Sequence, residues 1–507
     1  MPRRPKPKNA LSAGERAAMY EAEQREKLAK FNDRESPSEK QATVKETVAV
    51  AATGEVDKIA SPAKDKETRK KVLPKPQKAV VKVDFSVPVG KVKPMHGMCN
   101  GPVSYGADIS HLFKEIGVPC VRFDCTDTPM SGYAVDISRI FRNLEADPYD
   151  EANYDFAVTD KYVEAARLAG AEIILRLGES RDIFSPDKAP LRPRDLDALA
   201  RICVNVIRHY NDRWAKGYSL GITHIELWNV SQSEKKEALA EDMEIYRRLA
   251  GAVKLYDESL YVGGMSFCTA SRAGEFLRFC KKNRVPVDFI TLDLFGNDPA
   301  GLVGEAGDVI GIARNLGFGE LEVFAGKWAM SDGERLGDAL ADNERGMLKD
   351  AAFSGAVLLG LGNLDGVSGA FAYDAQPGVS PWCGIADRQG RALKPFYVFK
   401  AYGELYRAGE SVLCECLQAD GCAHNGIYAS AATSDDGRCY LMITSYDGCN
   451  TVDVRLDGIP DNVYEAEVFM LDGVKNMDSS GSVTVSGGKK RIVLNVSAYG
   501  VFLIKLF

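Results

Sequence analysis

Several features that would assign this chain to a class of protein are missing from its sequence. It contains no run of about eighteen apolar residues, the length that a transmembrane helix needs. Its first ten residues, MPRRPKPKNA, are basic, and the apolar region of a secretory signal does not follow them. We therefore expect a cytoplasmic protein without a membrane segment.

Spacings that bind metal are also missing. The twelve cysteines are scattered, and only Cys414 and Cys416 stand close together, with no C-x-x-C or Cys/His pattern of a zinc site. Buried free thiols are expected in place of disulfides or a metal centre. No cofactor is indicated either.

Aromatic residues are scarce in residues 1–77, which are rich in Lys, Glu, Ala, Pro and Ser. Such a segment buries too little apolar surface to offset its chain entropy, so we expect a disordered basic tail. Residues 12–31 are an exception, because Ser12 is followed three positions later by Glu15, the capping-box pattern of a helix start. This short helix is expected either to remain solvated or to dock on a protein partner.

The net charge is -7 although the tail is basic, so the rest of the chain is clearly acidic. An acidic globular part argues against general binding of nucleic acid. The basic ends of the tail could contact an acidic partner or RNA, or could act as a solvated linker.

The chain has 507 residues, 45% of them hydrophobic, which is enough for two or three domains. From residue 91 to 391, eight apolar runs alternate with helical patterns long enough for crossover connections. This alternation predicts an α/β TIM (β/α)8 barrel, with an open doubly wound sheet as the alternative. The eight runs are residues 93–99, 118–124, 172–178, 224–229, 260–266, 287–295, 321–328 and 366–374.

Residues 392–507 have a different texture, with short strands separated by turns such as SDDGR and SYDGCN. This pattern is typical of an antiparallel β-sandwich. Residues 78–90 alternate apolar and polar positions before the barrel begins, and no helix follows them. We expect this early strand to join the C-terminal sandwich.

From about residue 90 to the end, the chain resembles glycoside hydrolase family 39, a clan A family of β-xylosidases and α-L-iduronidases. The resemblance rests on the order and spacing of several segments along the whole chain. They are VRFD (121–124), IFRNLEADPYDEANYDF (140–156), ILRLGES (174–180), IELWN (225–229), VDFIT (287–291) and KPFYVFKAYGELY (394–406). The resemblance implies a retaining glycosidase, whose two carboxylates lie about 5 Å apart.

The sequence departs from that family at both catalytic positions. Alignment of Trp228 and Asn229 puts Val230 where the acid/base glutamate belongs, and alignment of Trp328 puts Lys327 where the nucleophilic glutamate belongs. Val230 has no proton to donate. An ammonium at position 327 opposes the positive charge of an oxocarbenium-like transition state, so no catalytic residue is expected.

The sixth strand departs as well, with Asp293 and Phe295 where the family usually carries His and Tyr. Strands six and seven are neighbours in a barrel, so we expect Lys327 and Asp293 to form a compensating ion pair. Relocated carboxylates would be the alternative source of activity. Their candidates are Glu179, which could bind ligand or cap a helix, Glu226, expected to serve the barrel interior, and Glu234, expected to be solvated.

Part of a sugar-binding surface is expected to survive at the ends of the barrel strands. Sugars present apolar faces that stack on aromatic rings, and hydroxyls that need donors and acceptors. For Arg122, Trp328 and Tyr373, ion pairing or packing inside the fold is the alternative role. The candidate ligand-binding residues are Arg122, Asp124, Glu179, Asn229, Asp293, Lys327, Trp328, Tyr373 and Trp382.

Three functions follow from these residues. The first is a family 39-like protein that has lost retaining glycosidase activity and binds carbohydrate or acts as a scaffold. The second is an active, β-xylosidase-like glycosidase with relocated carboxylates. The third is a structural protein that binds a partner through its N-terminal tail.

Overall fold

The computed structural model describes residues 78–104, 107–126, 133–180, 195–229, 236–331, 344–377, 384–418, 426–446, 451–461, 463, 465–485 and 488–507. The expected tail over residues 1–77, with its helix at 12–31, lies outside the described residues. None of the described helices is long and apolar enough to span a membrane.

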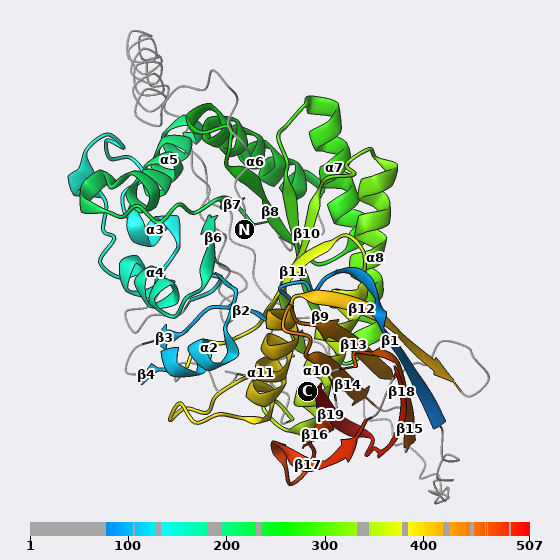
Figure 1. The fold of residues 1–507 in the computed structure, drawn as a ribbon. Helices are drawn as coiled ribbons and strands as arrows, with labels where there is room; N and C mark the ends of the chain where they lie inside the picture. The colour runs from blue at the N-terminus through cyan, green and yellow to red at the C-terminus, as the bar shows by residue number, and fades with distance from the viewer. Residues whose placement is uncertain are drawn as a thin grey trace, which may run out of the picture.

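Eight parallel strands of the described chain close into a barrel (Figure 1), which confirms the TIM-barrel prediction and excludes the open sheet. Each strand coincides with one of the eight apolar runs, because strands buried on both faces are continuously apolar. Around the barrel the strands are β2 (Gly97–Cys99), β5 (Cys120–Arg122), β6 (Glu172–Leu177), β7 (His224–Leu227), β8 (Tyr261–Phe267), β9 (Phe289–Gly296), β10 (Glu322–Met330) and β11 (Val367–Ala372).

Helices connect these strands and cover the barrel from outside (Figure 1). Several begin at side-chain caps that satisfy free backbone N–H groups, as Asp195 does for α5 and Asp298 for α8. The helices are α2 (Ser110–Ile116), α3 (Ile137–Ile140), α4 (Thr159–Leu168), α5 (Leu196–Asp212), α6 (Lys236–Tyr256), α7 (Ala270–Asn283), α8 (Pro299–Asn315), α10 (Leu348–Asn363) and α11 (Lys394–Ala408). Two 3-10 turns lie at Glu151–Asn153 and Trp214–Lys216, and β3 (Val103–Ser104) pairs with β4 (Ala107–Asp108).

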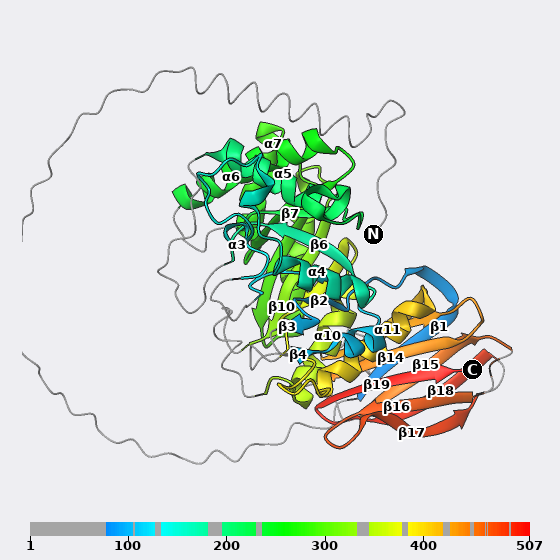
Figure 2. The same cartoon turned by 90° about the vertical axis from the view of Figure 1, so that its left-hand side faces the viewer.

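The C-terminal residues form a nine-stranded, sandwich-like sheet that packs against α10 and α11 (Figure 2). Its strand order is β17-β16-β19-β14-β13-β12-β1-β15-β18. These strands are β1 (Lys78–Lys91), β12 (Glu410–Gln418), β13 (Ile427–Thr433), β14 (Cys439–Tyr446), β15 (Thr451–Ile459), β16 (Glu465–Leu471), β17 (Asn476–Thr484), β18 (Gly488–Asn495) and β19 (Tyr499–Leu506). The sheet is antiparallel except between β1 and β15, which run parallel.

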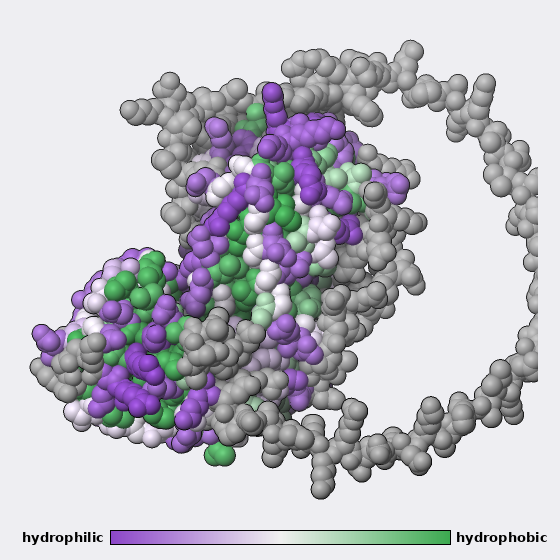
Figure 3. Space-filling model, turned by 90° about the vertical axis from the view of Figure 1, so that its right-hand side faces the viewer, coloured by the Kyte–Doolittle hydropathy of each residue, from purple (hydrophilic) through white to green (hydrophobic). Residues whose placement is uncertain are grey.

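Two connections bind the sheet to the barrel. β1 precedes the first barrel strand and lies between β12 and β15. α11 lies C-terminal to the expected domain boundary at residue 392, yet it follows the last barrel strand and packs on α2 and α10, as an eighth barrel helix does. Seen from the side in Figure 3, hydrophilic residues spread over both parts and are interrupted by hydrophobic ones.

Candidate functional site

Charged side chains of four strands meet inside the barrel, above a layer of aromatic rings. Phe289, Phe324 and Phe371 form that apolar layer with neighbouring buried residues. Lys327 on β10 lies directly opposite Asp293 on β9 in the strand register, so both side chains project to the same face of the sheet. Arg122 on β5, Asp124 just after it, Glu226 on β7, Asp293 and Lys327 make up what we call the central cluster.

The Arg122–Glu226 ion pair forms the base of the central cluster. The guanidinium donates from Nε to Glu226 Oε2 at 2.6 Å and from Nη2 to Oε1 at 2.7 Å, and neither residue is exposed to solvent. Arg122 also donates to the Gly326 carbonyl and the Ser266 hydroxyl. A buried ion pair is stable only when its hydrogen-bonding groups are satisfied, and this one meets that condition. Arg122 is therefore engaged inside the barrel.

Lys327 is held between two aspartates. Its Nζ lies 2.6 Å from Asp124 Oδ2 and 3.4 Å from Asp293 Oδ2, and only 5% of the residue is exposed. The expected Lys327–Asp293 pair is present, but the shorter contact is with Asp124. The ammonium also lies 5.5 Å from the centre of the Tyr373 ring, within range of a cation–π interaction.

The ionisation of Asp124, Asp293 and Lys327 follows from these contacts. Burial opposes the charge on Asp124, but the Lys327 and Arg122 charges outweigh it and hold the pKa of Asp124 well below its usual value. Burial raises the pKa of Asp293, although Lys327 acts in the opposite direction. For Lys327, the two aspartates overcome the effect of burial and raise its pKa well above the usual value. Lys327 therefore stays an ammonium ion.

A second polar group, the double clamp, joins the start of α3 to the end of β6. Asp136 accepts hydrogen bonds from the backbone N–H and hydroxyl of Ser180, and Arg176 donates to the same carboxylate at 2.7 Å. Glu179 in turn accepts from the backbone N–H of Ser138 at 2.7 Å and from its hydroxyl at 2.6 Å. Each acid thus binds the serine of the opposite segment.

Glu179 in the double clamp has a strongly shifted pKa. Burial and the neighbouring Asp136 charge raise the pKa of Glu179 to about 7, although the bonds from Ser138 act against that rise. Its carboxylate caps the short helix α3. Capping was one of the two roles expected for Glu179, the other being ligand binding. Residues 136, 138, 176 and 180 were not among the sequence candidates, because no spacing in the sequence indicates that the start of α3 and the end of β6 form hydrogen bonds with each other.

Asn229 connects the double clamp with the end of β7. Its Nδ2 donates to the Glu179 carbonyl at 3.1 Å. Its Oδ1 is buried and has no hydrogen-bond partner among the described residues, and the same holds for Asp293 Oδ1. Buried polar atoms are normally satisfied, so these two acceptors are the groups of the site best placed to meet an added donor.

The aromatic candidates lie in packed surroundings. Trp328 points away from the barrel interior, with its ring 6.1 Å from Phe399 on α11 and 6.3 Å from Phe353 on α10. Tyr373 is 6% exposed and meets Phe295 edge to face at 6.5 Å. Val230, Glu234 and Trp382 lie outside the described residues. The structure thus brings together Asp124, Asp293 and Lys327, but turns Trp328 to the helix layer.

Comparisons with known proteins agree with this architecture. The model of "Glycosyl hydrolases family 39" matches residues 131–303. A β-xylosidase from Geobacillus stearothermophilus is 26% identical over a match covering 32% of this chain and about a third (34%) of the relative's length.

Two solved structures extend the likeness to most of the chain. A glucosidase from Croceicoccus marinus has a TM-score of 0.68 and 21% identity, over 85% of this chain and 98% of the other. A monomeric β-xylosidase from Caulobacter crescentus has a TM-score of 0.62 and 17% identity, over 84% of this chain and 99% of the other. At these identities the two likenesses establish the fold of the chain.

Proposed function

We propose that this chain, a glycoside hydrolase family 39-like protein, binds carbohydrate at the mouth of its barrel without hydrolysing glycosidic bonds. By mouth we mean the C-terminal ends of the barrel strands, where sites of this fold lie. The observation that carries the proposal is the position of Lys327. Its ammonium is fixed by Asp124 and Asp293 on the strand that the resemblance assigns to the nucleophile.

Retaining hydrolysis requires a nucleophilic carboxylate and a carboxylic acid on opposite sides of the bond. At the two aligned positions this chain has an ammonium, Lys327, and an aliphatic side chain, Val230. The ammonium cannot attack the sugar while it remains protonated, and its charge disfavours the cationic transition state. The two substitutions together support a protein without hydrolytic activity.

The unpaired acceptors of the site support retained binding. Asn229 Oδ1 and Asp293 Oδ1 are buried and lack a donor within the described chain. A sugar hydroxyl is a donor of suitable size, and a hydrogen bond contributes about 0.5–1.5 kcal/mol net. We therefore assign to Asn229 and Asp293 the role of accepting hydroxyl hydrogen bonds.

One observation favours an active enzyme as the second candidate. Since Lys327 Nζ lies 2.6 Å from Asp124 and 3.4 Å from Asp293, the two Oδ2 atoms are at most 6.0 Å apart. Their pKa values also shift in opposite directions, as those of a nucleophile and an acid do. Against this role, Asp124 is 1% exposed and engaged by both Lys327 and Arg122.

Restoring the missing acids tests the proposal. We expect the unmodified protein and the single variants Val230→Glu and Lys327→Glu not to hydrolyse para-nitrophenyl β-xyloside or β-glucoside. The double variant, with or without Asp293→His, should give weak but measurable release of nitrophenol. Hydrolysis by the unmodified protein that Asp124→Asn or Asp293→Asn abolishes would establish the second candidate instead.

Binding is tested separately by calorimetry with xylotetraose and cellotetraose. At the mouth, Asn229→Ala and Asp293→Ala should each weaken binding about tenfold, the effect of losing one hydrogen bond of about 1.4 kcal/mol. The exposed Asp461→Asn serves as the control and should leave affinity unchanged. Absence of both turnover and binding would refute the carbohydrate role and favour a structural protein.

A further inference from the structure

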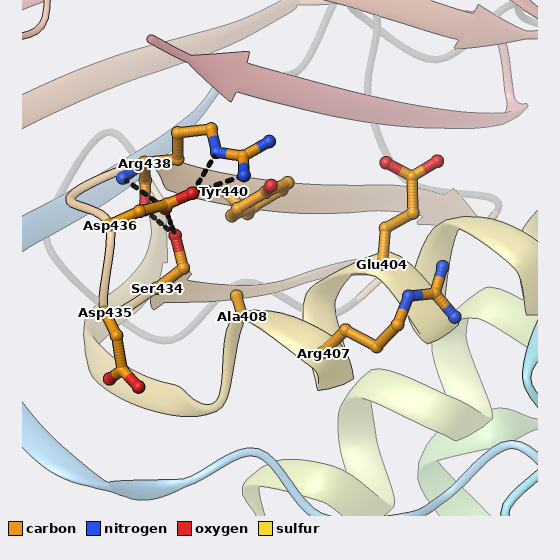
Figure 4. Close-up of a pocket in the computed structure, with 8 residues that line it drawn as sticks. All are labelled: Glu404, Arg407, Ala408, Ser434, Asp435, Asp436, Arg438 and Tyr440. Atoms are coloured by element: carbon orange, nitrogen blue, oxygen red, sulfur yellow. Dashed lines mark hydrogen bonds and ion pairs between the residues drawn. The ribbon is translucent and has the colours of Figure 1, made fainter.

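A polar groove of about 550 Å³ lies between the end of α11 and the turn that joins β13 to β14 (Figure 4). Figure 4 shows Glu404 and Arg407 projecting from α11 on one side, with Arg438 and Tyr440 on the other. The volume is in the range of about 300–1,000 Å³ that small-molecule sites occupy. Its eight lining residues are Glu404, Arg407, Ala408, Ser434, Asp435, Asp436, Arg438 and Tyr440.

The groove is distinct from the barrel mouth. Gly409, directly after α11, accepts a hydrogen bond from the N–H of Val92, which precedes the first barrel strand. Arg407 donates from Nη1 to the Ile116 carbonyl at the C-terminal end of α2. Both contacts place this end of α11 at the N-terminal ends of the barrel strands, whereas the mouth lies at their C-terminal ends.

The walls of the groove are held in place without any ligand. Asp436 accepts from Arg438 Nε at 2.8 Å and from the Ser434 hydroxyl, which fixes the turn. On the other wall, Glu404 forms an ion pair with Lys505 of β19. A site whose walls are already ordered loses little conformational entropy when a ligand binds.

Other groups in the groove remain available. The Asp435 carboxylate has no hydrogen bond or ion pair with the residues that the structure describes, and in Figure 4 it points away from Arg438. Arg407 donates from Nη1 to the Ile116 carbonyl, and its other N–H groups can donate to a ligand. Tyr440 is only half-buried and presents part of its ring. The groove thus offers an acceptor, donors and an aromatic surface.

We propose that this groove is a second carbohydrate-binding site, for a neutral oligosaccharide, that works independently of the barrel mouth. Two arginines and three acids line it, so its charges nearly balance and favour neither an anion nor a cation. Vicinal hydroxyls donate to carboxylates and accept from guanidinium groups, and a pyranose face packs on a tyrosine ring. A carbohydrate long enough to reach the groove and the barrel mouth at the same time would be bound with avidity.

Calorimetric titration of the full chain with xylotetraose and cellotetraose tests the groove. Tyr440→Ala removes the aromatic ring and Asp435→Asn replaces the charged acceptor by a neutral one, so each should raise the Kd of the groove about tenfold, which corresponds to about 1.4 kcal/mol. Asp461→Asn, at another exposed position, is the matched control. Tyr440→Phe retains the ring and should keep most of the affinity, which guards against a misfolded Tyr440→Ala protein.

The outcomes separate this site from the mouth. Two sites in the unmodified protein, one weakened about tenfold by Tyr440→Ala or Asp435→Asn and the other weakened by Asn229→Ala, support both proposals. Binding that Asn229→Ala weakens and Tyr440→Ala leaves unchanged overturns the groove while sustaining the mouth. Binding unaffected by Tyr440→Ala and Asp435→Asn together, or no binding at millimolar oligosaccharide, overturns the second site.

Discussion

The double clamp should make stability depend on pH through Glu179. Its pKa is about 7 in the folded protein, whereas the ordinary pKa of a glutamate is 4.5. Because the folded state keeps this proton to a higher pH, the resulting stability is fully present below about 4.5 and is lost as pH rises through 7. At 1.36 kcal/mol per pKa unit, with allowance for solvent screening of a half-buried carboxyl, the change is about 2–3 kcal/mol.

Urea unfolding of the wild type and Glu179→Gln at about pH 5, 6, 7 and 8 measures this effect, because these values span the rise through the pKa of Glu179. We expect the difference in unfolding free energy between the two proteins to shift by about 2–3 kcal/mol in favour of the variant between the lowest and highest pH. Taking the difference cancels groups distant from Glu179 that titrate alike in both proteins. The exposed Glu145→Gln should show no such shift. An equal pH dependence in wild type and Glu179→Gln would refute the assigned pKa.

Two further predictions concern the barrel. Lys327→Met should lower the unfolding free energy by about 3 kcal/mol, because Asp124 and Asp293 lose the buried cation that they share. Adding Asp293→Leu should recover part of that loss in denaturant titrations. Trp228→Phe should cost about 1–3 kcal/mol more than Trp328→Phe, because the Trp228 indole donates to buried Asp242 whereas Trp328 Nε1 has no described partner. Equal melting temperatures for the two tryptophan variants would contradict this difference.

The barrel could be predicted because its signal is repeated and local. Each strand is a short apolar run, and each connection is long enough for a helix, so eight units specify a closed barrel. The placement of β1 in the C-terminal sheet could also be inferred, since no helix follows it. Its parallel pairing with β15 could not, because alternation of polar and apolar residues fixes which face is buried but not which strand lies alongside.

The site was predictable only where strand geometry fixes a side chain's direction. Lys327 and Asp293 lie on adjacent strands, so their pairing followed from the order of strands. Asp124 lies beyond the end of β5, where alternation no longer applies, and its shorter contact with Lys327 required the structure. Trp328 follows Lys327 directly and therefore faces the opposite side, towards α10 and α11.

The electrostatics of the central cluster explain why a single reversion should not restore a glycosidase. Lys327→Glu would place a third carboxylate beside Asp124 and Asp293, at the position where an ammonium now contacts both. Arg122 offsets this charge only in part, because its guanidinium binds Glu226 through two hydrogen bonds and already contacts Asp124. Like charges so close raise the pKa of one acid and disfavour the ionised nucleophile that retaining hydrolysis needs. Changing Asp293 to histidine removes one of the three carboxylates, so the weak activity of the Val230→Glu, Lys327→Glu protein should come at a smaller cost in stability when Asp293→His is added.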